Sequence, residues 1–266
     1  MTPRFFDDID WSQAWFAAVR EEAQGLLAAD DWRAQLNQTA GQSGLSNHLE
    51  LPLRFITQEE LPEGTAYEAH ISATGLVPTR ENLHDFFNAL VWLTFPAIKR
   101  QLNALQAAQI AACGIGKSRG PARDAATIFD ENAALLVVAD TAEGANLITA
   151  LRAHAWQDAF VTQAEKFGRC AEVWCFGHAL MEKLVKPYKA ITAHTWVVTV
   201  APEYFELDGP GRRSYIDKMV AQQLAEQALT TADYTPLPVL GLPGWWTQQD
   251  AAFYADQQVF RAKRQS

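Results

Sequence analysis

The segment from Glu81 to Phe95 constrains the fold most, because apolar side chains cover nearly the whole circumference of a helix built from it. A helix that is apolar all round is a buried helix. Its length of about four turns also fits a core helix. The apolar positions are Leu83, Phe86, Phe87, Leu90, Val91, Trp92, Leu93 and Phe95.

Four polar side chains interrupt this apolar helix: Glu81, His84, Asp85 and Asn88. At the helical step they fall within an arc of roughly 100°. Buried polar groups destabilise a protein unless they find partners, so the arc must face a polar partner, a cavity or water. Two interpretations stay open. Asn82 and Asp85 form an imperfect capping box with structural neighbours, or the arc belongs to a functional site.

A second candidate follows a predicted strand over residues 171–176. His178 lies in the first turn of the predicted helix 177–186, and Glu182 lies one turn later on the same face. A helix N-terminus favours neutral imidazole, which can act as a general base or a metal ligand. The alternative is an ordinary surface pair at the border of the apolar face.

Asp130 and Glu131 lie between two predicted strands, 126–129 and 133–138, so we expect them in a hairpin turn. Carboxylates in turns mostly bind the local backbone. In the functional interpretation they supply an oxygen ligand or a general base at the edge of the sheet. Arg123 either pairs with Asp124 or holds an anionic substrate.

The remaining pattern indicates an α+β fold, largely helical, with a small mixed or antiparallel sheet. We expect an extended stretch over 64–75, a long helical region over 82–112 broken at Pro96, a strand over 195–200 and a helix over 214–229. Strands do not alternate regularly with helices, which argues against a doubly wound sheet. We predict one compact domain over 1–266. In it, residues 1–45 form a helical extension packed on the body, and residues 236–266 form an irregular segment.

Composition limits the partners. The net charge is −9, and phosphate backbones require clustered Lys and Arg, so we expect no nucleic-acid partner. The longest apolar run is far shorter than a membrane span of about 20 residues. Three cysteines and an acidic start without an apolar segment are typical of a cytoplasmic protein with reduced thiols. The oligomeric state stays open.

Several segments spread along the chain combine into one pattern. They are 82–92 (NLHDFFNALVW), 127–132 (TIFDEN), 177–184 (GHALMEKL), 236–245 (PLPVLGLPGW) and the closing Phe253-Tyr254 and Val259–Arg261. Together they resemble an uncharacterised bacterial family that is known only as a domain of unknown function. The resemblance covers about 82–261 and implies no activity, cofactor or catalytic residue. Ala133 stands where the family pattern leads us to expect Gly.

The leading functional hypothesis is a small-molecule, hydrolase-like enzyme. It requires that three groups of residues meet in one cleft, with His178 or His84 as general base. Four of them, His84, His178, Asp130 and Glu182, are also candidate ligands for a divalent metal such as Zn²⁺, Mn²⁺ or Fe²⁺. The alternative is a non-catalytic binding or scaffold protein whose buried polar residues are structural. The three groups are His84, Asp85 and Asn88; Asp130 and Glu131; and His178 and Glu182.

Overall fold

The computed structural model describes residues 4–113 and 121–263. Its α-helices are α1 (Arg20–Leu27), α2 (Trp32–Gln42), α3 (Tyr67–Thr74), α4 (Leu83–Thr94), α5 (Pro96–Cys113), α6 (Pro121–Asn132), α7 (Ala142–Arg152), α8 (His178–Leu184), α9 (Gly209–Glu226) and α10 (Ala251–Tyr254). Its strands are β1 (Arg54–Ile56), β2 (Leu76–Pro78), β3 (Ala133–Ala139), β4 (Ala171–Cys175), β5 (Thr192–Val200) and β6 (Thr235–Pro238). The α+β prediction is confirmed.

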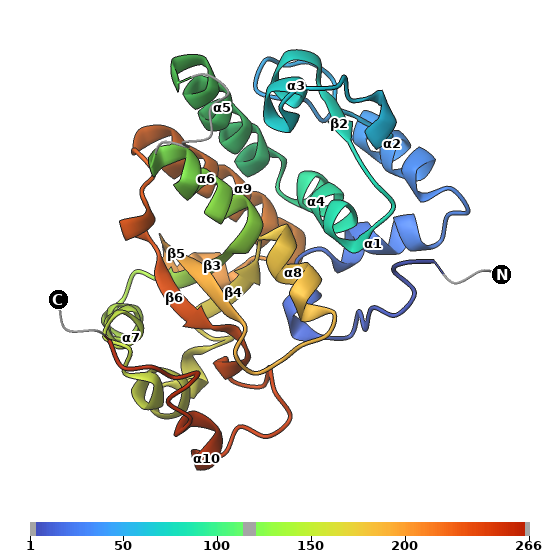
Figure 1. Cartoon of the computed structure of the whole chain (residues 1–266). Helices are drawn as coiled ribbons and strands as arrows, with labels where there is room; N and C mark the ends of the chain where they lie inside the picture. The colour runs from blue at the N-terminus through green and yellow to red at the C-terminus, as the bar shows by residue number, and fades with distance from the viewer. Residues whose placement is uncertain (1–3, 114–120, 264–266) are drawn as a thin grey trace.

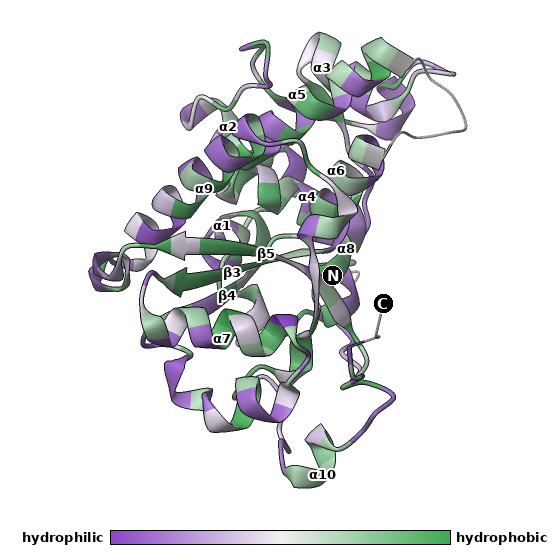
Figure 2. Ribbon diagram, turned by 90° about the vertical axis from the view of Figure 1, so that its left-hand side faces the viewer, coloured by the Kyte–Doolittle hydropathy of each residue, from purple (hydrophilic) through white to green (hydrophobic). Residues whose placement is uncertain are grey.

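The main sheet has the strand order β4-β3-β5-β6. Strands β3 and β5 pair in parallel, whereas β4 and β6 run antiparallel to their neighbours, so the sheet is mixed. Helices cover both faces: α7 lies on one side, and α4, α5, α6 and α9 lie on the other (Figures 1 and 2). Strands β1 and β2 form a separate parallel pair.

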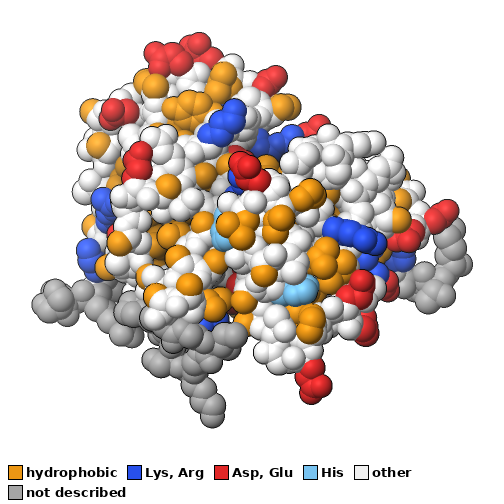
Figure 3. All heavy atoms as spheres, turned by 90° about the horizontal axis from the view of Figure 1, so that it is seen from above, with side chains coloured by type: hydrophobic (Ala, Val, Ile, Leu, Met, Phe, Trp, Pro, Cys, Tyr) orange, Lys and Arg blue, Asp and Glu red, His pale blue; other side chains and the backbone are white. Residues whose placement is uncertain are grey.

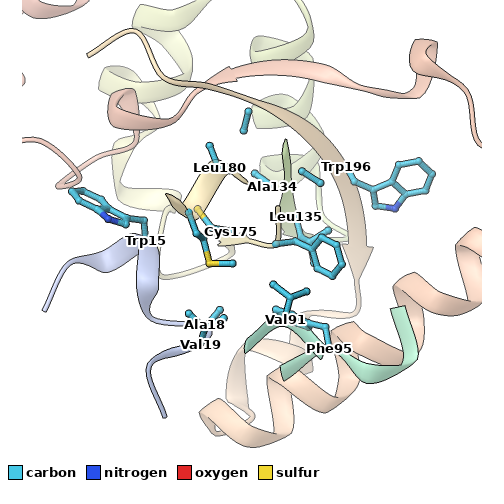
Figure 4. Packing of buried hydrophobic residues seen from close by; sticks show 14 of the residues in the cluster. Trp15, Ala18, Val19, Val91, Phe95, Ala134, Leu135, Cys175, Leu180 and Trp196 are labelled. Carbon is cyan, nitrogen blue, oxygen red and sulfur yellow. The ribbon is translucent and has the colours of Figure 1, made fainter. Parts of the chain in front are cut away.

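Strand β3 is buried at every position because both of its faces are covered. On one face, Leu135 points toward Val91 of α4 and Phe95 at the end of that helix (Figure 4). On the other face, Leu136 borders a small space that α7 also lines. The run of small and aliphatic residues in β3 therefore forms the middle layer of the core.

Helix α4 begins where the sequence predicts it. The Asn82 side chain accepts a hydrogen bond from the backbone N–H of Asp85 at 2.8 Å and caps the helix. The predicted break at Pro96 is confirmed, because α4 ends at Thr94 and α5 begins at Pro96. The Asp217 carboxylate of α9 accepts the N–H groups of Ala97 and Ile98, which are left without partners at this new helix start.

Two predicted extended regions are wrong. Residues 67–74 form helix α3, which ends at Gly75 in a left-handed conformation with φ 74°. The alternation of Tyr67, Ala69 and Ile71 spans only five residues, too few to decide between a strand and a helix. Gly75, which accepts the left-handed backbone without strain, ends the helix.

The hairpin at Asp130 is the second error. Residues 121–132 form helix α6, and β3 follows directly and pairs with β4 and β5 instead of a hairpin partner. The buried residues Ala125, Ala126, Phe129 and Asp130 follow helical spacing. Asp130 and Glu131 therefore lie in the last turn of a helix. Ala133, which stands where the family pattern leads us to expect Gly, is not among the described non-glycine residues with positive φ. This position therefore does not require the left-handed backbone that favours Gly.

The N-terminal helices pack on the body through aromatic rings. Phe6 stacks on Phe86 and Phe16 stacks on Phe87, so the N-terminal segment covers one face of α4. At the other end of the chain, residues 235–238 form the edge strand β6, which a short 3-10 helix (Val239–Gly241) and the short helix α10 follow. Seen from above, acidic, basic and hydrophobic side chains are interspersed over the surface (Figure 3). Among the helices that the structure describes, none is long and apolar enough to cross a bilayer.

Candidate functional site

A cleft of about 660 Å³ lies between α3, α4, α6 and α8. Of the residues singled out from the sequence, seven line this cleft, and Glu182 reaches it by bonding to His84. The seven are His84, Asp85, Asn88, Arg123, Asp130, Glu131 and His178. Glu81, the first residue of the polar arc, is exposed and lies 3.7 Å from Arg33 instead.

The two imidazole rings of the cleft are in direct contact. His84 Nε2 lies 3.1 Å from His178 Nε2, and the ring planes are nearly perpendicular. On the other side of the His84 ring, Nδ1 lies 2.9 Å from Glu182 Oε2. A carboxylate in that position accepts the Nδ1–H and so fixes the tautomer of the ring. The packing of α4 against α8 thus brings together two histidines that are 94 positions apart.

His178 lies deeper than His84. Its side chain is buried, and Nδ1 lies 3.9 Å from Asp130 Oδ2, with no hydrogen-bond partner among the described residues. Burial lowers the pKa of His178 to about 4, and the nearby Asp130 carboxylate opposes this shift only in part. At neutral pH, His178 is therefore an uncharged imidazole between a second imidazole and a carboxylate.

Lys99 of α5 links the polar side chains of α4 to Asp130 of α6. The sequence analysis does not single it out. Its ammonium group donates to Asp130 Oδ1 at 2.6 Å and to Asn88 Oδ1 at 2.9 Å. The Asn88 amide in turn donates to the Tyr67 hydroxyl at 3.0 Å. Burial alone would raise the pKa of Asp130, but Lys99, with His178, holds it below the ordinary value. Asp130 therefore stays ionised.

A polar stripe along α5 was the signal that sequence reasoning overlooked. Lys99, Asn103 and Gln106 recur at helical spacing among apolar residues, and all three are buried. Such a stripe requires polar partners for the same reason as the arc of α4. Its partners come from α3, α4 and α6, which the sequence alone does not place beside it.

Glu68 is a further cleft residue that the sequence did not reveal. The Asn103 amide lies 3.4 Å from Glu68 Oε2, and the amide nitrogen of Gln106, turned toward the carboxylate, lies 2.9 Å from the same atom. Burial raises the pKa of Glu68 to about 7, and the Asp130 carboxylate adds to this shift. Lys99, Asn103 and Arg123 oppose the shift without cancelling it.

Asp85 has a structural partner. Its carboxylate accepts the backbone N–H of Arg80 at 2.7 Å and two guanidinium N–H groups at 2.9 Å. These bonds fix the chain that enters α4 and hold Arg80 at the cleft wall. Bidentate guanidinium–carboxylate pairs are among the stronger polar contacts.

Arg123 and Glu131 lie on one side of α6. Both line the cleft, and Glu131 is exposed. Within 4–113 and 121–263, no hydrogen bond or ion pair involves the Arg123 guanidinium, and none joins it to Asp124. Its charge is therefore available to the cleft.

The candidate metal ligands surround the imidazole pair without converging. Glu182 and Asp130 lie beside the Nδ1 atoms, while the two Nε2 atoms face each other. Across the described part of the chain, no three His, Cys, Asp or Glu side chains gather so that they could hold a metal ion. An ion at the Nε2 atoms would need water or substrate as further ligands.

Comparison with known proteins adds the family. The family described as "Protein of unknown function (DUF3025)" matches residues 53–264. The chain belongs to this family. No curated protein and no solved structure matches the chain.

The DUF3025 match contains every residue that lines the cleft. The segment before residue 53 lies outside it and contributes Phe6, Phe16 and Trp32, which pack on the aromatic face of α4. The cleft is therefore a property of the family region, and the N-terminal segment supports the helix that carries His84.

Proposed function

We propose that the cleft is the active site of a hydrolase-like enzyme that acts on a small molecule. In this proposal the His84–His178 pair activates a water molecule for attack on the substrate. The observation that carries it is the succession Glu182, His84, His178 and Asp130, in which hydrogen-bond distances of 2.9 and 3.1 Å join the first three side chains and Asp130 lies 3.9 Å beyond.

The chemistry follows from the protonation states. A water bound beside the two contacting Nε2 atoms gives its proton to one of them, which acts as general base. The imidazolium that forms lies between the Glu182 and Asp130 carboxylates, which stabilise its charge. Lys99 keeps Asp130 ionised and in place, so it acts as a positioning residue.

Metal-assisted hydrolysis would use the same two nitrogen atoms as ligands. A divalent ion such as Zn²⁺, Mn²⁺ or Fe²⁺ suits imidazole ligands and would supply an activated water at neutral pH. The carboxylates beside the Nδ1 atoms are the outer partners that metal-bound histidines commonly have. The test below therefore includes metal removal.

The test is a hydrolysis panel of p-nitrophenyl esters and p-nitrophenyl phosphate, run with the intact protein, after EDTA, and with Zn²⁺ or Mn²⁺ added back. We expect His178→Gln and His84→Gln to lower turnover of any hydrolysed substrate by at least about 100-fold, the usual contribution of a general base. The control is His154→Asn. His154 lies outside the cleft with φ 56°, a conformation that Asn tolerates.

Two outcomes contradict the proposal. One is a panel with no substrate turned over by the unaltered protein. The other is full activity in His178→Gln. Either outcome favours the binding or scaffold interpretation, in which the paired groups Arg80–Asp85 and Lys99–Asp130 only fix the core.

A further inference from the structure

Two oppositely charged side chains of the cleft, Arg123 and Glu68, do not pair with each other. Arg123 comes from α6 and Glu68 from α3, and both line the cleft. Among described residues they form no ion pair, although Arg123 is close enough to affect the Glu68 carboxyl electrostatically. Of the other charged groups of the cleft, Arg80 is paired with Asp85 and Lys99 with Asp130, whereas the exposed Glu131 forms no ion pair among the described residues.

Helix α5 holds Glu68 in place. The Asn103 amide donates to its Oε2 atom, and the Gln106 amide nitrogen, turned toward the carboxylate, lies 2.9 Å from Oε2 and 3.3 Å from Oε1. Oε1 has the longer and weaker of these amide contacts, so it is the oxygen better placed to take up a proton and meet a ligand. With a pKa of about 7, the carboxyl is mostly protonated below neutral pH, where its O–H is a donor.

We propose that Arg123 and Glu68 together form a subsite for an anionic oxygen group, a carboxylate or a phosphate-type group, on the molecule that enters the cleft. The guanidinium offers a planar fork of donors, which matches the geometry of such groups. The carboxyl of Glu68 adds one neutral donor from α3. This inference rests on the cleft being the functional site of the proposed function, and it does not depend on hydrolysis.

Ionisation of Glu68 opposes binding at this subsite. Once Glu68 carries a negative charge, it repels an anion and competes for Arg123. The groups that face Glu68 are Lys99 from α5 and Asp130 and Arg123 from α6, with Tyr67 beside it on α3. Lys99 and Asp130 neutralise each other at 2.6 Å, so the charge of Glu68 decides whether an anion meets a positive or a neutral subsite.

The test measures binding without turnover. Isothermal titration calorimetry with sulfate and with acetate uses anions whose charge is constant between pH 6 and pH 8. For a group that titrates near pH 7 and binds the anion only when protonated, the affinity of the unaltered protein falls by about ten-fold over this interval. Sulfate binding alone points to a phosphate-type ligand, and acetate binding alone points to a carboxylate.

The variants isolate the two residues. Glu68→Gln keeps the amide contacts but carries no charge, so we expect equal affinity at pH 6 and pH 8. We expect Arg123→Gln to lose binding at both pH values. Glu203→Gln, an exposed carboxyl outside the cleft, is the control and should keep the ten-fold fall.

Three results would overturn the subsite: a pH-dependent affinity that survives in Glu68→Gln, unchanged binding in Arg123→Gln, or no binding of either anion to the unaltered protein at pH 6. None of these results bears on turnover in the hydrolysis panel. An inactive protein that still binds anions in this pattern would reject the hydrolase proposal and keep the subsite.

Discussion

The ammonium group of Lys99 lies 2.6 Å from Asp130 Oδ1, and the two side chains are only 5% and 9% exposed. Removing one partner of a buried pair leaves an uncompensated charge, which typically costs about 3–5 kcal/mol. We expect Lys99→Met to lower the free energy of unfolding by about that amount. Urea denaturation at pH 7 measures it.

The control for this prediction is the pair Lys189–Asp256, which is also close at 2.8 Å but partly exposed. We expect Lys189→Met to cost at most about 1 kcal/mol. In the double variant Lys99→Met with Asp130→Asn, most of the loss should be recovered, because no unpaired charge remains buried. Equal losses in the Lys99 and Lys189 variants would mean that the Lys99–Asp130 pair is solvated.

His178 makes the stability depend on pH. Its folded-state pKa of about 4 lies below the ordinary value of 6.5, so between these values the unfolded chain binds the proton more readily. Stability is therefore complete above pH 6.5 and falls by about 2–4 kcal/mol on acidification to pH 4. Urea denaturation at intervals across this range measures the loss in the unaltered protein.

The comparison with His178→Gln isolates this contribution. The Glu68 carboxyl, whose raised pKa favours folding as the pH falls from 7 toward 4.5, is present in both proteins and cancels. We expect the acid-side loss to be smaller in His178→Gln by the same 2–4 kcal/mol. Parallel pH profiles for the two proteins would rule out a buried neutral His178.

Replacing His84 should cost less stability than replacing Lys99, because 34% of the His84 side chain is exposed. Its replacement by Ala removes the partner of His178 Nε2, a group that is itself buried. We expect a loss of about 1–3 kcal/mol, the cost of an unsatisfied buried polar group. Thermal unfolding measures it, with Glu182→Gln as the control, since that change keeps a hydrogen-bond acceptor for His84 Nδ1. An unchanged midpoint in His84→Ala would mean that water replaces the imidazole.

Helical spacing within the single segment of α4 was enough to predict its cleft residues. His84, Asp85 and Asn88 were singled out because polar residues on an apolar helix need a partner, and all three line the cleft. The break at Pro96 and the strand β5 were equally local properties, since proline geometry and a β-branched run suffice to predict them.

The remaining cleft residues come together only through tertiary packing. Lys99 contacts Asp130, and Glu68 comes within its electrostatic influence, only because α5 packs against both α3 and α6, which no local pattern encodes. The alternation at residues 67–71 hid α3, and the short segment around Asp130 was mistaken for a hairpin although its buried residues follow helical spacing. Both errors arose in short segments, where the periods of a strand and a helix are hardest to separate.

Gly177 determines how closely α6 and α8 approach. A Cβ atom at this position would lie 2.5 Å from the backbone of Glu131 and Asn132, closer than such atoms come in proteins. Its own φ of −58° is ordinary, so the requirement for Gly is one of space. Gly177→Ala must push apart the helix ends that carry Asp130 and His178.

We therefore expect Gly177→Ala to cost about 1–3 kcal/mol, the usual price of overpacking a tight contact. It should also weaken the anion binding and any hydrolysis measured in the cleft. The matched control is Gly25→Ala in α1, where nothing lies within 4 Å of the added Cβ and the better helix former should stabilise the protein by about 0.5–1 kcal/mol. Chemical denaturation of both variants gives the comparison. If Gly177→Ala is as stable as Gly25→Ala and keeps its binding, the close approach of α6 and α8 does not set the spacing between Asp130 and His178.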